Sequence, residues 1–222
     1  MDILETDSVE LSFGEKKVIA GGYMKLEGGR IHALVGRNGF GKSSLMRVVF
    51  GSLQPQFKFT RYNNTPLPYP YKQPGLICYL PQFDFVPKRL RLSAFLKYYN
   101  VSPDKLVACF PEMEGMMHVK LGALSGGQLR MVTSLAVILS PVKFVLLDEP
   151  FTHIMPLHVE TLKSMIRAEA AAGKGFLITD HMYDHVLDLA DSFYYMEWLV
   201  TRPVSREELL EKDYFLRMKW EG

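Results

Sequence analysis

Cysteine is scarce in this chain of 222 residues, which contains only Cys78 and Cys109. The two lie far apart and belong to no CxxC or Cys/His spacing, so no zinc or redox motif is built on them. Free cysteine is among the most buried residue types. We therefore expect both to be reduced core thiols of a cytosolic protein.

Net charge is also small, because 26 Lys and Arg residues face 24 Asp and Glu residues, giving +2 at pH 7. No strong global field points to a nucleic-acid partner, and none is expected. With 17 glycines, 13 prolines, 48% hydrophobic and 23% charged residues, the composition excludes fibrous, low-complexity and disordered proteins.

Long hydrophobic runs are missing too. No stretch approaches the roughly 18 uninterrupted apolar residues that a membrane-spanning helix needs. The N-terminus, MDILETDSVELSF, lacks the basic start and apolar run of a secretory signal. We expect a soluble protein with one large domain, or one core carrying a subdomain. Any membrane role then comes through a partner.

Four short β-rich runs are each followed by a polar or glycine cluster. They are residues 31–35, 76–80, 143–148 and 175–180. Nearly continuous apolar strands of this kind are buried on both faces, which is typical of a parallel sheet covered by helices. The predicted fold class is α/β. Ligands bind such sheets beyond the carboxyl ends of the strands, so the residues that follow these runs are expected to meet at one edge.

Helices are predicted from their end signals. Residues 42–50 stop at Gly51, and residues 156–172 begin with proline and stop at Gly173. Residues 83–140 hold shorter helical candidates and no convincing strand. We interpret this region as a helical subdomain inserted into the sheet.

Two further regions are predicted to contain short strands. Residues 54–75 are rich in proline and aromatic residues, and the first 30 residues alternate weakly and contain glycine turns. We expect the N-terminal strands to pair antiparallel with the sheet. The segment from Ser192 lacks a glycine hairpin, and Ser205 to Glu208 has the spacing of a helix cap.

Residues 36–43, GRNGFGKS, fit the pattern G-x-x-x-x-G-K-[ST] between a predicted strand and a predicted helix. Glycines let backbone N–H groups wrap a phosphate, and the helix N-terminus adds partial positive charge. Lys42 is predicted to reach the β- and γ-phosphates, and the Ser43 hydroxyl to ligate Mg²⁺. The alternative is a chance glycine turn. The predicted nucleotide-binding residues here are Gly36, Arg37, Asn38, Gly39, Phe40, Gly41, Lys42, Ser43 and Ser44.

Two adjacent acids, Asp148 and Glu149, end an apolar strand. Burying two carboxylates there costs desolvation free energy unless a cation lies close to them. Asp148 is predicted to hold Mg²⁺ through its water shell, and Glu149 to orient and deprotonate an attacking water. The alternative is a surface turn in which both acids are solvated.

The pentapeptide Leu124, Ser125, Gly126, Gly127, Gln128 starts a helix. Ser125 and Gln128 have capping-box spacing, and the two glycines leave the first amides of the helix uncovered. The sequence therefore predicts a second anion-binding helix terminus. The alternative is a well-capped structural helix.

Together, residues 36–43, 124–128 and 147–150 (LDEP), in this order, closely resemble the nucleotide-binding (ATPase) subunit of an ATP-binding cassette (ABC) transporter. The resemblance covers nearly the whole chain. It implies a P-loop NTPase (RecA-like) fold with a mostly parallel sheet, an antiparallel β subdomain and an inserted α-helical subdomain.

The resemblance also implies how the chain is divided. Residues 1–222 form a single ABC ATPase domain. Residues 1–82 and 141–222 supply the α/β core with its antiparallel part, and residues 83–140 supply the helical signature subdomain.

Three more site residues follow from the resemblance. Gln82 matches the glutamine that contacts Mg²⁺ and the attacking water, His181 matches the switch histidine that senses the γ-phosphate, and Phe13 matches the aromatic that stacks on adenine. Their alternatives are a turn residue, a helix-start histidine and a core aromatic. The implied catalytic residues are Glu149, His181, Lys42 and Gln82; the implied metal-binding residues are Ser43, Gln82 and Asp148.

The implied function is ATP hydrolysis with Mg²⁺ by a head-to-tail dimer, expected to be a homodimer. ATP lies between the P-loop of one copy and residues 124–128 of the other. A separate transmembrane permease docks near residues 82–92, where Phe83, Phe85, Val86 and Leu92 are either contact residues or subdomain core. The subunit is expected to be cytoplasmic and peripheral on the inner face of the membrane. A non-transport ABC ATPase and a slow-turnover ATP-binding regulatory module remain alternatives.

The chain departs from the family at several positions. Met155 occupies the place of an expected aspartate before Pro156, so we expect the loss of a helix cap and of a trans-dimer contact. Met131 and Ala136 replace common arginines in the signature helix. The expected consequence of Met155 is slower or less tightly coupled turnover.

Overall fold

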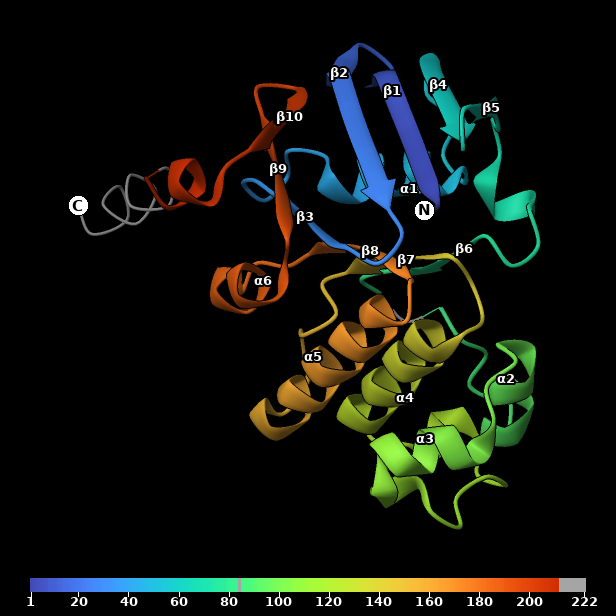
Figure 1. Ribbon diagram of the computed structural model, residues 1–222. Coiled ribbons are helices and arrows are strands. Elements are labelled where there is room, and N and C mark those ends of the chain that lie inside the picture. The colour runs from blue at the N-terminus through green and yellow to red at the C-terminus, as the bar shows by residue number, and fades with distance from the viewer. Residues whose placement is uncertain (84, 212–222) are drawn as a thin grey trace.

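The computed structural model describes residues 1–83 and 85–211. Strands from both ends of the chain join one mixed sheet, which curls so that its two halves face each other across a helix (Figure 1). A layer of longer helices covers the opposite face of the parallel half. No helix in the described part of the chain has the length and apolarity needed to cross a membrane.

The parallel half consists of β3 (Ile31–Val35), β8 (Gly175–Thr179), β7 (Phe144–Asp148) and β6 (Ile77–Leu80), which pair in this order and all run in the same direction. Every residue of β3, β7 and β8 is buried. The prediction of a parallel sheet with both faces covered is therefore confirmed, and the cause is the apolar run within each strand.

The antiparallel half contains β1 (Ile3–Phe13), β2 (Lys16–Glu27), β4 (Phe57–Tyr62) and β5 (Thr65–Pro66). These strands pair antiparallel with one another. The prediction that the N-terminal strands pair antiparallel with the main sheet is wrong in its direction. The link is a parallel pairing between β2 and a C-terminal strand, at Gly21 and Val200.

That C-terminal strand belongs to a hairpin that sequence analysis missed. β9 (Ser192–Glu197) pairs parallel with β3 and antiparallel with β10 (Val200–Val204), which turns back toward β2. The turn residues, Trp198 and Leu199, both have positive φ, 48° and 70°. Asn-Gly is the usual choice for such a turn. Here the Leu199 carbonyl accepts a hydrogen bond from the Ala20 N–H (2.7 Å), so a tertiary contact supports it.

The complete sheet order is therefore β5-β4-β1-β2-β10-β9-β3-β8-β7-β6. After β10, the Ser205 hydroxyl accepts from the Glu208 N–H (3.1 Å), and residues 206–211 are helical. The predicted cap is confirmed. The remainder of the tail lies outside the described residues.

Helix α1 (Lys42–Phe50) lies between the two halves of the sheet. Its buried side chains pack against β1 and β2 on one side and against Phe144 and Leu177 on the other; they include Leu45, Met46, Val48 and Val49. The helix ends at Gly51, in the left-handed conformation (φ 96°), as predicted. The residue before α1 is thereby held at the carboxyl edge of β3.

Helices α4 (Gly126–Leu139) and α5 (Pro156–Ala171) lie side by side on the other face (Figure 1). Residues 129–139 of α4 are all buried. Helix α5 faces the same core through Val159, Leu162 and Ile166. Helix α6 (Tyr183–Leu189) packs near β3.

The segment between β6 and α4 is helical, as predicted. It holds α2 (Leu92–Tyr98), α3 (Pro103–Cys109) and two 3₁₀ turns, Pro111–Met113 and Leu121–Ala123, while a third 3₁₀ turn, Pro70–Lys72, precedes β6. Among the described residues of 83–140 there is one isolated bridge, and no strand. The division into a core and an inserted subdomain stays a prediction, since one apolar cluster is continuous across this segment, α4 and α5.

Cys78 and Cys109 are unpaired thiols, half-buried against that cluster. Burial raises the pKa of both thiols above its ordinary value, which keeps them protonated. Their predicted character as reduced thiols packed on the core is confirmed, although neither is fully buried.

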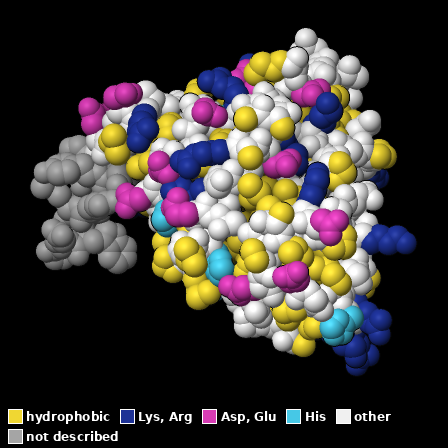
Figure 2. Space-filling model, turned by 60° about the horizontal axis from the view of Figure 1, so that its bottom comes forward, with side chains coloured by type: hydrophobic (Ala, Val, Ile, Leu, Met, Phe, Trp, Pro, Cys, Tyr) yellow, Lys and Arg dark blue, Asp and Glu magenta, His cyan; other side chains and the backbone are white. Residues whose placement is uncertain are grey.

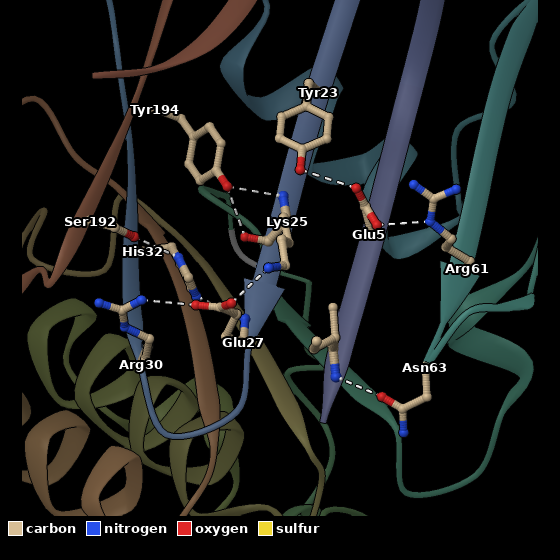
Figure 3. Close-up of polar contacts among 11 residues, drawn as sticks. Glu5, Tyr23, Lys25, Glu27, Arg30, His32, Arg61, Asn63, Ser192 and Tyr194 are labelled. Atoms are coloured by element: carbon tan, nitrogen blue, oxygen red, sulfur yellow. Dashed lines mark hydrogen bonds and ion pairs between the residues drawn. The ribbon is translucent and has the colours of Figure 1, made fainter. Parts of the chain in front are cut away.

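A cluster of charged side chains lies at the amino end of β3 (Figure 3). Glu27 pairs with Lys25 (2.8 Å) and Arg30 (2.9 Å). The Nε2 atom of His32 accepts from the Glu27 N–H (2.9 Å), which leaves Nδ1–H to donate to Ser192 Oγ (2.7 Å). We call Lys25, Glu27, Arg30 and His32 the amino-end cluster. It ties β2, β3 and β9 together.

Candidate functional site

The loops that follow β3, β6 and β7 border one hollow of about 490 Å³ at the carboxyl edge of the sheet. Residues that follow three of the four predicted apolar runs therefore meet at this hollow. The residues lining the hollow are Phe13, Lys16, Val18, Asn38, Gly39, Gly41, Lys42, Ser43, Ser44, Gln82 and Glu149.

The loop 36–41 needs glycine at two positions. A Cβ at Gly36 would lie 2.4 Å from the Met196 carbonyl oxygen, and one at Gly41, where φ is 99°, would lie 2.8 Å from Val18 Cγ1. Gly41 is also the N-cap of α1 and supplies no side-chain acceptor. The first amides of α1 are therefore directed toward the hollow without a capping side chain, an arrangement that favours an anion.

The Lys42 ammonium group is buried within this loop. It donates to the carbonyl oxygens of Gly36 (2.7 Å) and Arg37 (3.1 Å) and lies 3.5 Å from Asn38 Oδ1. Burial lowers the pKa of Lys42, an effect that the carboxylates of Glu149 and Asp148 partly oppose. A phosphate oxygen would be a stronger acceptor for this cation than the neutral carbonyls it now contacts.

Asp148 is 1% exposed at the end of β7. Its two oxygens accept from the Ser43 hydroxyl (3.1 Å) and the Tyr79 hydroxyl (2.8 Å). Burial raises the pKa of this carboxyl, and the two hydrogen bonds only partly offset the effect. Sequence analysis missed Tyr79. Its hydroxyl group lies in an otherwise apolar strand, three residues before Gln82, and this feature of the sequence could have indicated a role in the site.

The oxygens of Ser43 and Asp148 fit a hard cation. Among the described residues, no group of three or more His, Cys, Asp and Glu side chains could hold a metal ion by itself. Mg²⁺ usually keeps several waters and binds one or two protein oxygens together with substrate phosphates. The donor set is thus appropriate for Mg²⁺ that arrives with a nucleotide.

Glu149 has left-handed backbone geometry, with φ 50°. For a non-glycine residue this conformation costs about 1–2 kcal/mol. Its amide donates to the Thr179 carbonyl (2.7 Å), and its Oε2 accepts from Gln82 Nε2 (2.8 Å) and lies 3.5 Å from His181 Nδ1. The structure therefore brings three of the predicted catalytic side chains together at one carboxylate oxygen.

Asp180 is a buried residue that sequence analysis treated only as the end of a strand. Its carboxylate accepts from the Phe151 N–H (3.1 Å) and the Met182 N–H (2.9 Å). These bonds join the loop after Glu149 to the loop that carries His181. An acid directly before the predicted switch histidine was the signal for it.

Arg130 is the third residue that sequence analysis missed. Its guanidinium donates to the carbonyl oxygens of Pro81 (2.9 Å), Asp148 (3.0 Å) and Glu149 (2.7 Å). A single arginine on a helix with a buried face was a weak signal, because these three acceptors are backbone atoms from two other loops.

Phe13 is 52% exposed and borders the hollow, so the core-aromatic alternative is wrong. Its ring is free to stack on a planar group. Lys16 and Val18, on the next strand, line the same end of the hollow.

Residues 124–128 do not line this hollow. Ser125 and Gln128 form the predicted capping box, with bonds of 3.0 and 3.2 Å. A Cβ at Gly126 would meet no atom within 4 Å, whereas Leu124 is buried in the core. Within one chain, then, the structure separates this helix terminus from the P-loop.

Met155 is the N-cap of α5 and makes no side-chain capping bond. Its side chain is 59% exposed. The expected loss of a cap is confirmed, and only the Met155 carbonyl is used, accepting from the N–H groups of His158 and Val159.

Comparison with known proteins gives sequence relatives over most of the chain. A family model described as "ABC transporter" matches residues 21–152. The Nod factor export ATP-binding protein I of Rhizobium meliloti is 27% identical over 205 residues, which cover 87% of this chain and 61% of that protein. The chain thus spans about three fifths of the length of this relative. The lipopolysaccharide export system ATP-binding protein LptB of Haemophilus influenzae is 30% identical over 212 residues, covering 87% of this chain and 86% of that protein.

Solved structures show the same fold. The ATP-binding subunit of an ABC transporter superposes with a TM-score of 0.82 at 20% identity, covering 95% of this chain and 92% of that one. A nucleotide-free ATP-binding cassette from an ABC transporter gives 0.80 at 23% identity, covering 96% and 94%. The family model matches more than half of the chain, and LptB aligns along most of both lengths. The chain therefore belongs to the ABC transporter family.

Proposed function

We propose that this chain is an ATP-hydrolysing cassette that powers a separate transmembrane permease. The observation that carries the proposal is the hollow at the carboxyl edge of the sheet. It combines a phosphate-binding loop with a Gln82–Glu149 pair at 2.8 Å, and Asp148 lies beside Ser43 at its base. The relatives at 27% and 30% identity are named as ATP-binding proteins of export systems, which supports the same function.

Each side chain has a definite task in this proposal. Loop 36–41 and Lys42 bind the phosphates, and Phe13 stacks on the adenine ring. Glu149, oriented by Gln82, accepts a proton from the attacking water, and His181 contacts the γ-phosphate. Mg²⁺, held by Ser43, Gln82 and Asp148, would neutralise charge on the phosphates.

A second copy of the chain completes the site. Residues 124–128 lie outside the hollow of their own chain, and the Gly126 surface is open. A helix terminus with uncovered amides is suited to a phosphate. We therefore propose a head-to-tail homodimer with two ATP molecules, each between the P-loop of one copy and the LSGGQ segment of the other.

The permease is proposed to dock beside Gln82. Phe83 is 76% exposed and Phe85 is also exposed, so both are available for contact. Leu92 is fully buried and Val86 packs against the core, so the core alternative holds for these two. Exposed phenylalanines next to a catalytic glutamine are suited to transmit nucleotide state to a partner. The proposed location is the cytoplasmic face of the membrane, through this contact.

The face drawn in Figure 2 is less suited to a nucleic acid. Figure 2 shows acidic, basic and hydrophobic side chains mixed over one face, without a continuous basic surface there. One observation does favour a second function, an ATP-binding regulatory module with slow turnover: the uncapped Met155 lies in the loop where an aspartate is expected.

Glu149→Gln tests the main proposal. The purified chain is expected to hydrolyse ATP in the presence of Mg²⁺. The variant should lose at least about 100-fold of that rate while retaining ATP and eluting as a dimer in gel filtration. Glu114→Gln, at an exposed acid far from the hollow, is the matched control and should hydrolyse normally. Near-normal hydrolysis by Glu149→Gln removes Glu149 from the role of base, and a wild-type chain that binds ATP without turnover favours the regulatory module.

A further inference from the structure

One guanidinium holds the backbone on both sides of the Gln82–Glu149 contact. Arg130, on the second turn of α4, is 6% exposed. Its Nη1 donates to the carbonyl of Pro81, directly before Gln82, and its Nη2 donates to the carbonyls of Asp148 and Glu149.

These bonds close a ring. Arg130 donates to the carbonyl of Pro81, which directly precedes Gln82. The Gln82 side chain donates to the Glu149 side chain, and the Glu149 carbonyl accepts from Arg130. Glu149 is in the left-handed region, and its N–H and C=O are both engaged, by the Thr179 carbonyl and by Arg130. The guanidinium therefore fixes the backbone from which each member of the pair projects.

The same arginine belongs to the helix that begins with the LSGGQ segment. Ser125 caps α4, and Arg130 follows Gln128 by two residues. Because a helix moves largely as a rigid element, a shift of its N-terminus is carried to Arg130, and from there to both loops.

We propose that Arg130 is a positioning residue that makes the alignment of Gln82 and Glu149 depend on the placement of the signature helix. The inference rests on the proposed function, in which residues 124–128 bind the nucleotide of a second copy. When residues 124–128 bind that nucleotide, the signature helix moves, and the three charge-assisted hydrogen bonds of Arg130 reposition Gln82 and Glu149 in the copy that carries the helix.

Arginine is suited to this task and lysine is not. Its planar fork presents several N–H groups in fixed directions, so it can bond carbonyls from two different loops at once. A lysine ammonium is a single point donor on a flexible stem. Arg130→Lys should therefore keep the positive charge and lose the fixed geometry.

The test compares Arg130→Met and Arg130→Lys with the wild-type chain. We expect Arg130→Met to lower kcat for ATP by about 30-fold, because misplacement of a reacting group by about 1 Å costs up to about 100-fold. Its KM for ATP should stay within about two-fold, since no P-loop contact changes. Arg130→Lys should be intermediate, with kcat about five-fold below wild type.

Two variants control for loss of stability. Val137→Ala removes buried methyl groups from the same helix without touching either loop. Arg61→Met removes the ion pairs of Arg61 with Glu5 and Asp7 in the antiparallel half. Both should lower the melting temperature and leave kcat unchanged.

Amide hydrogen exchange supplies a readout without turnover. In Arg130→Met, exchange should increase in the segments around Gln82 and Glu149 and stay unchanged in the P-loop, whereas Val137→Ala should show no such pattern. If the wild-type chain binds ATP without hydrolysing it, the proposed function fails, and exchange still decides the role of Arg130.

Three results would overturn the inference. The first is a kcat loss in Arg130→Met no greater than that of a control variant with an equal loss of melting temperature. The second is an increase in KM that accounts for the whole loss of activity. The third is unchanged amide exchange in the segments around Gln82 and Glu149. If Arg130→Met does not fold, Arg130→Lys carries the test, and a normal kcat in that variant overturns the inference as well.

Discussion

The charged side chains near the two ends of β3, a strand of five residues, have different kinds of partner. At the amino end, Glu27 contacts two cations, Lys25 and Arg30. At the carboxyl end, the hydrogen bonds of Lys42 go to neutral carbonyl and amide oxygens, and those of Asp148 come from two hydroxyls.

The pKa values follow this difference. The two cations, mainly through hydrogen bonds, lower the pKa of Glu27 to about 2. Burial raises the pKa of Asp148 and lowers that of Lys42, so the charged forms of both are disfavoured by their surroundings. Paired charges stabilise the fold, whereas buried charges with neutral partners are retained where a ligand supplies the missing charge. Four experiments test this contrast between the two ends.

The largest effect is expected for Asp148→Asn. ATP turnover should fall at least about 100-fold, because the carboxylate proposed to hold Mg²⁺ is lost. The free energy of unfolding without nucleotide should rise by about 1 kcal/mol at pH 7, since a buried carboxylate with a raised pKa becomes neutral. Urea unfolding and an ATPase assay measure the two quantities. A clear loss of stability would contradict the assignment of Asp148 to the ligand-dependent end.

The second-largest effect is a loss of stability at acidic pH, which we expect to arise in the amino-end cluster. Burial lowers the pKa of His32 to about 4, from an ordinary value of 6.5. The folded state thus binds fewer protons in this interval, and stability present above pH 6.5 is lost as pH falls toward 4. Between pH 7.5 and 5 we expect a loss of about 2 kcal/mol from this group. His32→Gln should flatten this part of the profile, whereas His118→Gln, at an exposed site, should not; equal profiles for both variants rule out His32 as the source.

Glu27→Gln is the counterpart of Asp148→Asn, since it removes the same charge at the other end of β3. Its lowered pKa means that the stability it contributes is complete above about pH 4.5 and is lost as pH falls through about 2. The substitution should cost about 1–2 kcal/mol at pH 7, because Lys25 and Arg30 are partly exposed and screened by solvent. Turnover should be unchanged. If Glu27→Gln instead lowers turnover at constant stability, the contrast between the ends is broken.

The smallest effect is expected for Met155→Asp. An aspartate at this N-cap can accept the free amides of α5 and should add about 1 kcal/mol of stability. Basal ATPase activity should increase by up to about three-fold, a size typical of sub-kcal/mol changes in a barrier. An unchanged rate in a folded and stabilised variant would show that the loop does not limit turnover.

Much of the fold was predictable because its signals are local. The four parallel strands were apparent as apolar runs, and the ends of α1 and α5 as Gly51 and Gly173. The hairpin of β9 and β10 was not, because its turn lacks glycine and is supported by the bond from Ala20 to Leu199. That contact depends on the order of strands, which no local pattern encodes.

The residues of the candidate site likewise divide into those that the sequence predicted and those that it did not. Lys42, Ser43, Gln82, Asp148, Glu149 and His181 were predicted because each follows a strand in a recognisable motif. Tyr79, Arg130 and Asp180 were missed because most of their partners are distant in sequence: Tyr79 and Asp148 are 69 positions apart. A residue that acts by orienting another carries no motif of its own.

The sequence alone predicted the candidate residues for phosphate and Mg²⁺, their order along the chain and the strands that they follow. Periodicity, glycine spacing and strand ends are local properties, so they are legible in the primary structure. The tertiary structure alone decided that Asp148 accepts from two neutral hydroxyls and that Arg130 joins two loops. Those contacts arise only when β8 inserts between β3 and β7 and α4 packs across the ends of β6 and β7.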